Sequence, residues 1–107
     1  MLKHLNRLKE AKALLRKAIP VARRVFGNSH QVTIVMRWIY AEALYMDAGA
    51  TLDDLREAVT TLEDAERIAR RVLGGNHPVT QHLETSLRQS CAALRARETP
   101  SPPPGSA

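Results

Sequence analysis

The sequence is poor in aromatic residues and holds a single cysteine, Cys91, so no disulfide can form within the chain. No stretch approaches the roughly 18 consecutive apolar residues of a membrane-spanning helix. The N-terminus lacks the apolar run of a secretory signal. We therefore expect no membrane partner and predict a cytoplasmic protein. Ala, Leu, Arg and Glu dominate between the turn-forming residues and favour helix, so we expect no sheet.

The sequence also lacks the usual signatures of catalysis and of metal or cofactor binding. His77 and His82 are five residues apart and do not share a helix face, as paired metal ligands would. No nucleophile motif surrounds Cys91. The pair Gly74-Gly75 lacks the glycine and lysine spacing of a phosphate-binding loop. We predict a protein that is not an enzyme and binds no metal or cofactor.

The net charge is +5 and the pI is about 10, which would steer acidic partners weakly toward the chain. Two arginine pairs, Arg23-Arg24 and Arg70-Arg71, stand near the predicted ends of helices. Helix C-termini favour cations, so the pairs need no ligand to explain them. We do not expect nucleic acid as the main partner.

An internal repeat organises the chain, with similar segments separated by 47 residues. The pairs are Leu8–Ala11 with Leu55–Ala58, Ala22–Gly27 with Ala69–Gly74, and His30–Thr33 with His77–Thr80. Chance matches of Ala and Arg are common, but a shared Gly and His in constant phase are not. Recurrence at this period indicates a helical repeat architecture.

Apolar residues spaced by three or four predict helices over about 5–26, 31–47, 52–73 and 77–97. Pro20 lies inside the first and predicts a kink near 16–17 rather than an end. Gly27 predicts a left-handed cap at the end of the first helix, and Gly74 and Gly75 are predicted to end the third at the equivalent corner. The second helix is apolar on most sides and is predicted to be the most buried, while the fourth has one narrow stripe, as a terminal helix needs.

Side chains that can cap helix N-termini follow each predicted turn. Asn28 and Ser29 precede the second helix, Thr51 precedes the third and Asn76 precedes the fourth. Each can accept a hydrogen bond from a free backbone N–H of the first turn. We predict these residues as the N-caps.

The segments Val25–Thr33 and Val72–Thr80 resemble the turns of the long tetratricopeptide repeats of kinesin light chains. The resemblance implies an all-α fold, an α–α superhelix of antiparallel helical hairpins with about four helices, over residues 1–98. It also implies close helix contacts at Ala11, Ala41 and Ala58. Residues 99–107 hold four of the six prolines and are predicted to be a disordered tail.

Two features depart from that family. Residues 47–54 look like an insertion of about five residues, and Arg88 replaces the small residue expected on the fourth helix. Residues 29–73 form one complete unit between two half units, so we expect a fragment of a longer array, or a chain that depends on a partner or on self-association.

One side of the second helix carries residues that step by three, four and three: Val35, Trp38, Glu42 and Tyr45. The resemblance places them in a concave groove together with three residues of the fourth helix: His82, Thr85 and Gln89. The alternative is that Trp38 is an ordinary core residue. We predict a non-catalytic scaffold that binds a protein or peptide in this groove. The alternatives are a basic helical module that binds RNA or acidic surfaces, and a structural segment of a homo-oligomer.

Overall fold

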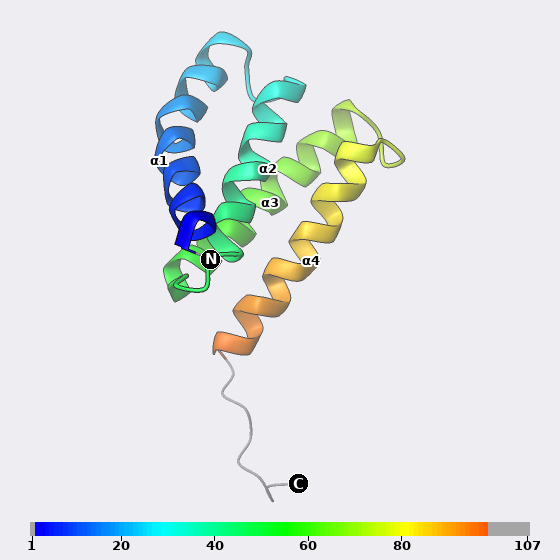
Figure 1. Cartoon of the computed structure of the whole chain (residues 1–107). Coiled ribbons are helices and arrows are strands. Elements are labelled where there is room, and N and C mark those ends of the chain that lie inside the picture. The colour runs from blue at the N-terminus through cyan, green and yellow to red at the C-terminus, as the bar shows by residue number, and fades with distance from the viewer. Residues whose placement is uncertain (1, 99–107) are drawn as a thin grey trace, which may run out of the picture.

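The computed structural model describes residues 2–98, with side chains from residue 7 onward. Within that part the chain forms four α-helices and no strands: α1 (Leu2–Val25), α2 (Gln31–Tyr45), α3 (Leu52–Val72) and α4 (Pro78–Glu98) (Figure 1). The predicted all-α fold is confirmed, and the helix ends fall within a few residues of their expected places. The predicted tail, 99–107, lies outside the described residues.

The helices follow one another as antiparallel hairpins joined by short turns (Figure 1). Helix α2 packs against α1, α3 and α4, while α3 packs against α2 and α4. No helix of the described residues is long and apolar enough to cross a lipid bilayer. The arrangement places α2 and α4, which are separated in sequence by all of α3, in direct contact.

Alanine and leucine fill the interfaces between helices. Ala41, Ala58 and Ala65 are completely buried, as are Leu44 and Leu62. Small residues at these points let the helix backbones approach, and leucine fills the remaining space at the density of a protein interior. Helix α2 buries seven of its 15 residues and α3 six of its 21, so the prediction that the second helix is the most buried is confirmed.

Both predicted glycine corners are confirmed. Gly27 has φ +90° and Gly74 has φ +95°, a backbone region that residues with a side chain rarely adopt. The Gly27 N–H donates to the Arg23 carbonyl at 3.0 Å, and the Gly74 N–H donates to the Ala69 carbonyl at 3.2 Å. These bonds satisfy carbonyls at the ends of α1 and α3. The two corners are therefore equivalent points of the repeat.

The predicted N-caps of α2 and α4 were wrong. Histidines take the place of Ser29 and Asn76: the Val32 N–H donates to His30 Nδ1 and the Val79 N–H donates to His77 Nδ1, each at 3.1 Å. An unprotonated imidazole nitrogen can accept a hydrogen bond as an Asn or Ser oxygen does. The cap in each case is the residue directly after the one predicted. The recurrent histidines are thus helix caps.

The cap of α3 and the continuation of α1 through Pro20 agree with the sequence. Thr51 Oγ1 accepts from the Asp54 N–H at 3.1 Å, while Asp54 Oδ2 accepts from the Thr51 N–H at 3.0 Å, which is a reciprocal capping box. Helix α1 continues through Pro20 without an end. Thr51 therefore explains where α3 begins, as His30 and His77 explain where α2 and α4 begin.

Candidate functional site

The face shared by α2 and α4 is organised around Trp38. Its indole stacks on the His82 ring, with centroids 5.3 Å apart and planes inclined by 14°. Its Nε1–H donates to Ser86 Oγ at 2.9 Å. The indole is only partly buried and rests against the hydrophobic core. It therefore lies between the two predicted alternatives, with one part in the core and one at the surface.

Polar side chains continue this contact along both helices. Ser86 Oγ donates to Glu42 Oε2 at 3.3 Å, and Tyr45 Oη donates to Gln89 Oε1 at 3.0 Å. Burial raises the pKa of Tyr45, and the nearby Glu42 carboxylate raises it further. Tyr45 therefore stays protonated and remains a hydrogen-bond donor. The result is a polar seam between α2 and α4 with two aromatic rings in it.

The structure joins most of the predicted groove residues but leaves two apart. Trp38, Glu42 and Tyr45 of α2 all contact α4. Trp38 stacks on His82 and Tyr45 donates to Gln89, whereas Glu42 accepts from Ser86. Thr85 is exposed and its hydroxyl donates to the Gln81 carbonyl of its own helix. Val35 instead lines a mostly apolar pocket of about 370 Å³ at the start of α2, with His30, Gln31, Val32 and Met36.

Sequence reasoning missed Ser86, which is 4 % exposed and links Trp38 to Glu42. A signal for it exists. Leu83, Ser86 and Ser90 step by three and four residues and are all buried, so they mark the face of α4 that packs inward. A small hydroxyl on that face is the partner an indole N–H needs when it is buried.

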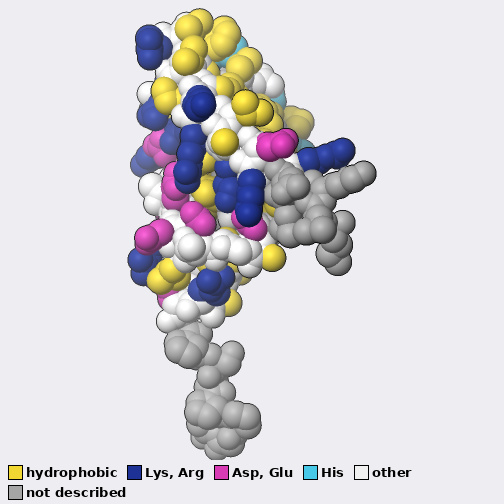
Figure 2. Space-filling view, turned by 60° about the vertical axis from the view of Figure 1, so that its left-hand side comes forward, with side chains coloured by type: hydrophobic (Ala, Val, Ile, Leu, Met, Phe, Trp, Pro, Cys, Tyr) yellow, Lys and Arg dark blue, Asp and Glu magenta, His cyan; other side chains and the backbone are white. Residues whose placement is uncertain are grey.

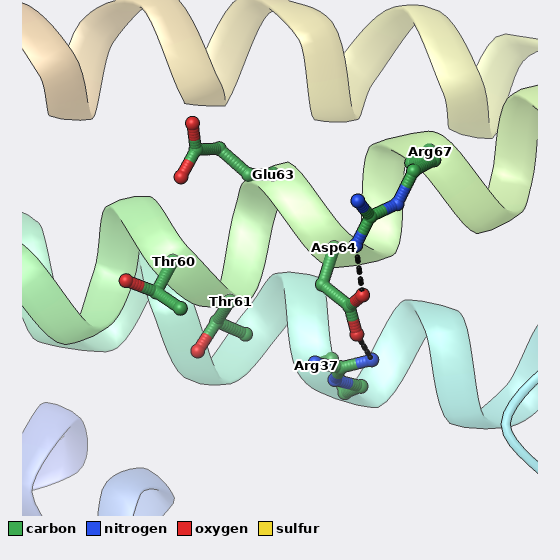
Figure 3. Close-up of a pocket in the computed structure, with 6 residues that line it drawn as sticks. All are labelled: Arg37, Thr60, Thr61, Glu63, Asp64 and Arg67. Carbon is green, nitrogen blue, oxygen red and sulfur yellow. Dashed lines mark hydrogen bonds and ion pairs between the residues drawn. The ribbon is translucent and has the colours of Figure 1, made fainter.

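A second polar cluster lies between α2 and α3 (Figure 3). Arg37 Nη1 lies 2.8 Å from Asp64 Oδ2, and Arg67 Nη2 lies 2.6 Å from Asp64 Oδ1. The Arg37 guanidinium, followed by that of Arg67, holds the pKa of the Asp64 carboxyl below its ordinary value. Asp64 is therefore ionised near neutral pH and cannot serve as a proton donor there.

This cluster borders a polar pocket of about 350 Å³ lined by Arg37, Asp64, Arg67 and neighbouring α3 residues. Arg37 is 9 % exposed, so its charge needs the Asp64 partner. The pair therefore fixes α2 on α3. Among the described residues, no three His, Cys, Asp or Glu side chains gather as a metal site would require.

Comparison with known proteins gives one match. Residues 1–31 match the family model of the tetratricopeptide repeat. No curated protein and no solved structure matches the chain. The matched residues include all of α1, the Gly27 corner and the His30 cap, which are the features that recur 47 residues later at Gly74 and His77. The match therefore falls on the first copy of the internal repeat.

Proposed function

We propose that this chain is a non-catalytic tetratricopeptide-like module, of the kinesin-light-chain type, that binds a protein or peptide on its α2–α4 face. Three observations support the proposal: the family match over residues 1–31, the recurrence of its Gly and His turn after 47 residues, and the packing of antiparallel hairpins. We also propose a cytoplasmic setting, to which a lone cysteine is suited.

The observation that carries the proposal is the pair of aromatic rings in the seam between α2 and α4. Trp38 and Tyr45 are partly buried, so each is held in place yet has surface left for a ligand. Rigid aromatic side chains with a polar tip bury large areas at low cost in conformational entropy. They are the side chains that most often anchor a binding partner.

The polar groups of the seam could then orient the ligand backbone. The Tyr45–Gln89 hydrogen bond is exposed, so a peptide could replace either partner without leaving a buried group unsatisfied. The Trp38–Ser86 bond is more buried and would remain. Val35 would extend the surface beyond the Trp38 end of the seam, and the exposed Thr85 would add to it between His82 and Gln89.

Peptides selected from a random library against the whole chain test this proposal. We expect selected peptides to bind Tyr45→Ala and Trp38→Ala variants about tenfold more weakly than the wild-type chain in calorimetry. The matched control is Val72→Ala, an exposed position on α3, which should bind normally. Equal loss for the control, or no loss for either aromatic variant, would contradict the proposal.

Two alternatives give different results in simple measurements. Helix α1 carries eight Lys or Arg and one Glu, so a role in binding RNA has an observation in its favour. That role predicts a steep fall of RNA affinity with salt, because phosphate contacts release counterions. A homo-oligomer would show a multiple of the 11.9 kDa chain mass in light scattering.

A further inference from the structure

The internal repeat offers the same helix surface twice, once packed between two helices and once packed against one. All six buried residues of α3 have a counterpart on α1, 47 residues earlier, and five of the six are identical. The pairs are Leu55/Leu8, Ala58/Ala11, Leu62/Leu15, Ala65/Ala18, Ile68/Val21 and Ala69/Ala22. On α1 only Ala22 of this set is buried. The difference arises because α3 is packed between α2 and α4, whereas among the described residues α1 packs against α2 alone.

The next helix of each copy shows the same contrast. Ser86 of α4 is 4 % exposed beneath Trp38, whereas its counterpart on α2, Ile39, is 44 % exposed. Ile68 is 9 % exposed and its counterpart Val21 is 51 % exposed. A single helix in the place that α2 takes on α3 and α4 would cover both exposed residues. We call this surface of α1 and α2 the end face, defined by Leu14, Ala18, Val21, Val32, Met36 and Ile39.

Not every exposed apolar residue belongs to the end face, and the repeat separates them. Val25 is 67 % exposed, but its counterpart Val72 is also 47 % exposed. The position of Val25 is therefore open to solvent in both copies and calls for no covering helix. Val21 and Val25 are the same residue type on the same helix, so a substitution at Val25 is a matched control for the same substitution at Val21.

The charges around the end face indicate what kind of helix fits it. Helix α3 has six acidic and four basic residues, and its Asp64 pairs with Arg37 of the helix that covers it. Helix α1 has eight basic residues and one acidic one, and Lys17 stands where α3 has Asp64. Figure 2 shows Lys and Arg side chains interspersed with Asp and Glu side chains on one face of the molecule, with hydrophobic side chains gathered at one end. A helix that covered α1 as α2 covers α3 would therefore gain from an acidic side chain opposite Lys17.

We propose that the end face binds an acidic amphipathic α-helix of another protein, which lies on α1 and α2 as α2 lies on α3 and α4. An isologous dimer of this chain fits less well, because two strongly basic α1 helices would face each other. This surface adjoins the α2–α4 face at the pocket that Val32, Val35 and Met36 line, but it includes neither Trp38 nor Tyr45, so the inference does not depend on the function proposed above.

The probe is a fluorescently labelled synthetic peptide of residues 31–46 that carries Arg37→Glu. It keeps the apolar residues with which α2 covers α3 and offers Lys17 an acidic partner. We expect saturable binding to the whole chain, about tenfold weaker for the Val21→Asp and Ile39→Asp chains and unchanged for Val25→Asp. A Trp38→Ala, Tyr45→Ala chain should bind the probe normally.

A charge exchange completes the test. A Lys17→Asp chain should lose affinity for the Arg37→Glu peptide and gain affinity for the peptide with the natural arginine. Lys17, Val21 and Ile39 are exposed, so the variants should keep their circular dichroism. Absence of binding, equal loss with Val25→Asp, or no reversal with Lys17→Asp would overturn the proposal. A dimer that Val21→Asp dissociates would also overturn it, by making a second copy the occupant.

Discussion

Trp38 of α2 stacks face to face on His82 of α4, and the indole N–H is bound by Ser86 of the same helix. The chain has one tryptophan, so its fluorescence reports this contact alone. The contact joins two helices that are separated in sequence by a whole helix.

Removal of the His82 ring should change the environment of Trp38. In a His82→Ala chain one face of the indole becomes exposed to water, so we expect its emission maximum to move to longer wavelength. Thr85→Ala is the control, because the Thr85 hydroxyl bonds to its own helix. An unchanged spectrum for His82→Ala, or an equal shift for both variants, would contradict the stacked geometry.

Tyr40→Phe should destabilise the chain measurably. The Tyr40 hydroxyl accepts from Arg16 Nε at 3.0 Å and donates to Glu57 Oε2 at 2.6 Å, so it joins α1, α2 and α3. Loss of these bonds, which involve charged partners and a buried residue, should lower the free energy of unfolding in urea by about 1–2 kcal/mol. Tyr45→Phe loses one exposed bond and should cost less. Equal costs would show that the Tyr40 network adds nothing.

Gly27→Ala and Gly74→Ala should each lower the free energy of unfolding by about 1 kcal/mol. Nothing lies within 4 Å of an added Cβ at either site, so the cost comes from the positive φ alone and should be similar at both corners. Gly49→Ala is the control, because its Cβ would meet Asp47 Oδ1 at an ordinary 3.6 Å. A larger cost at Gly49 would argue against backbone strain as the cause.

His77→Ala should lower the free energy of unfolding by about 1 kcal/mol, the usual effect of losing an N-cap acceptor. His77→Asn should recover much of the lost free energy, because the asparagine side-chain oxygen can accept a hydrogen bond from a backbone N–H in the first turn of α4. The same pair of changes at His30 should behave alike. If Asn fails to rescue at both sites, the histidines have a role other than capping.

The stability of the chain should fall in acid partly through Asp47. The Gly49 N–H, followed by Lys12, holds the pKa of the Asp47 carboxyl below its ordinary value. A carboxyl whose pKa is lower in the folded chain stabilises the fold above the unfolded pKa of about 3.9, and this contribution disappears as the pH falls through the folded pKa.

Asp47→Asn should therefore flatten the fall of the unfolding free energy below about pH 4. The pKa of Asp64 is also lowered, chiefly by Arg37, so Asp64 too stabilises the folded chain less as the pH falls. Part of the pH dependence should therefore remain in the Asp47→Asn chain. Lys12→Met removes only the smaller cause and should flatten the slope less than Asp47→Asn. Urea titrations at several pH values measure the slope, and an equal effect of both variants would assign the shift to Lys12.

The fold could be predicted because its determinants are local. The helix period, the glycines at +φ and the Thr51 capping box all act within a few residues, and the repeat doubled the evidence for each corner. The caps His30 and His77 were missed because Ser and Asn beside them are the commoner acceptors, and which one reaches the first turn depends on side-chain geometry.

The candidate site was harder to predict than the helices that carry it. The face of α2 that bears Trp38 followed from its spacing, but the partners of Trp38 depend on the angle at which α4 crosses α2 and on rotamers. Sequence periodicity holds no information on either. Val35 stepped in phase with Trp38, yet it borders a different pocket because the α2–α4 contact begins further along the helix.

The volume of one side chain bears on the shape of any larger assembly of such hairpins. The Trp38 indole lies between α2 and α4, so its volume bears on how the second hairpin packs on the first. The same position in the next copy is Thr85, a much smaller residue. A hairpin stacked beyond α4 would therefore approach its neighbour more closely at this position. Successive hairpins in a row would then be related by unequal rotations, and the superhelix would have an uneven pitch.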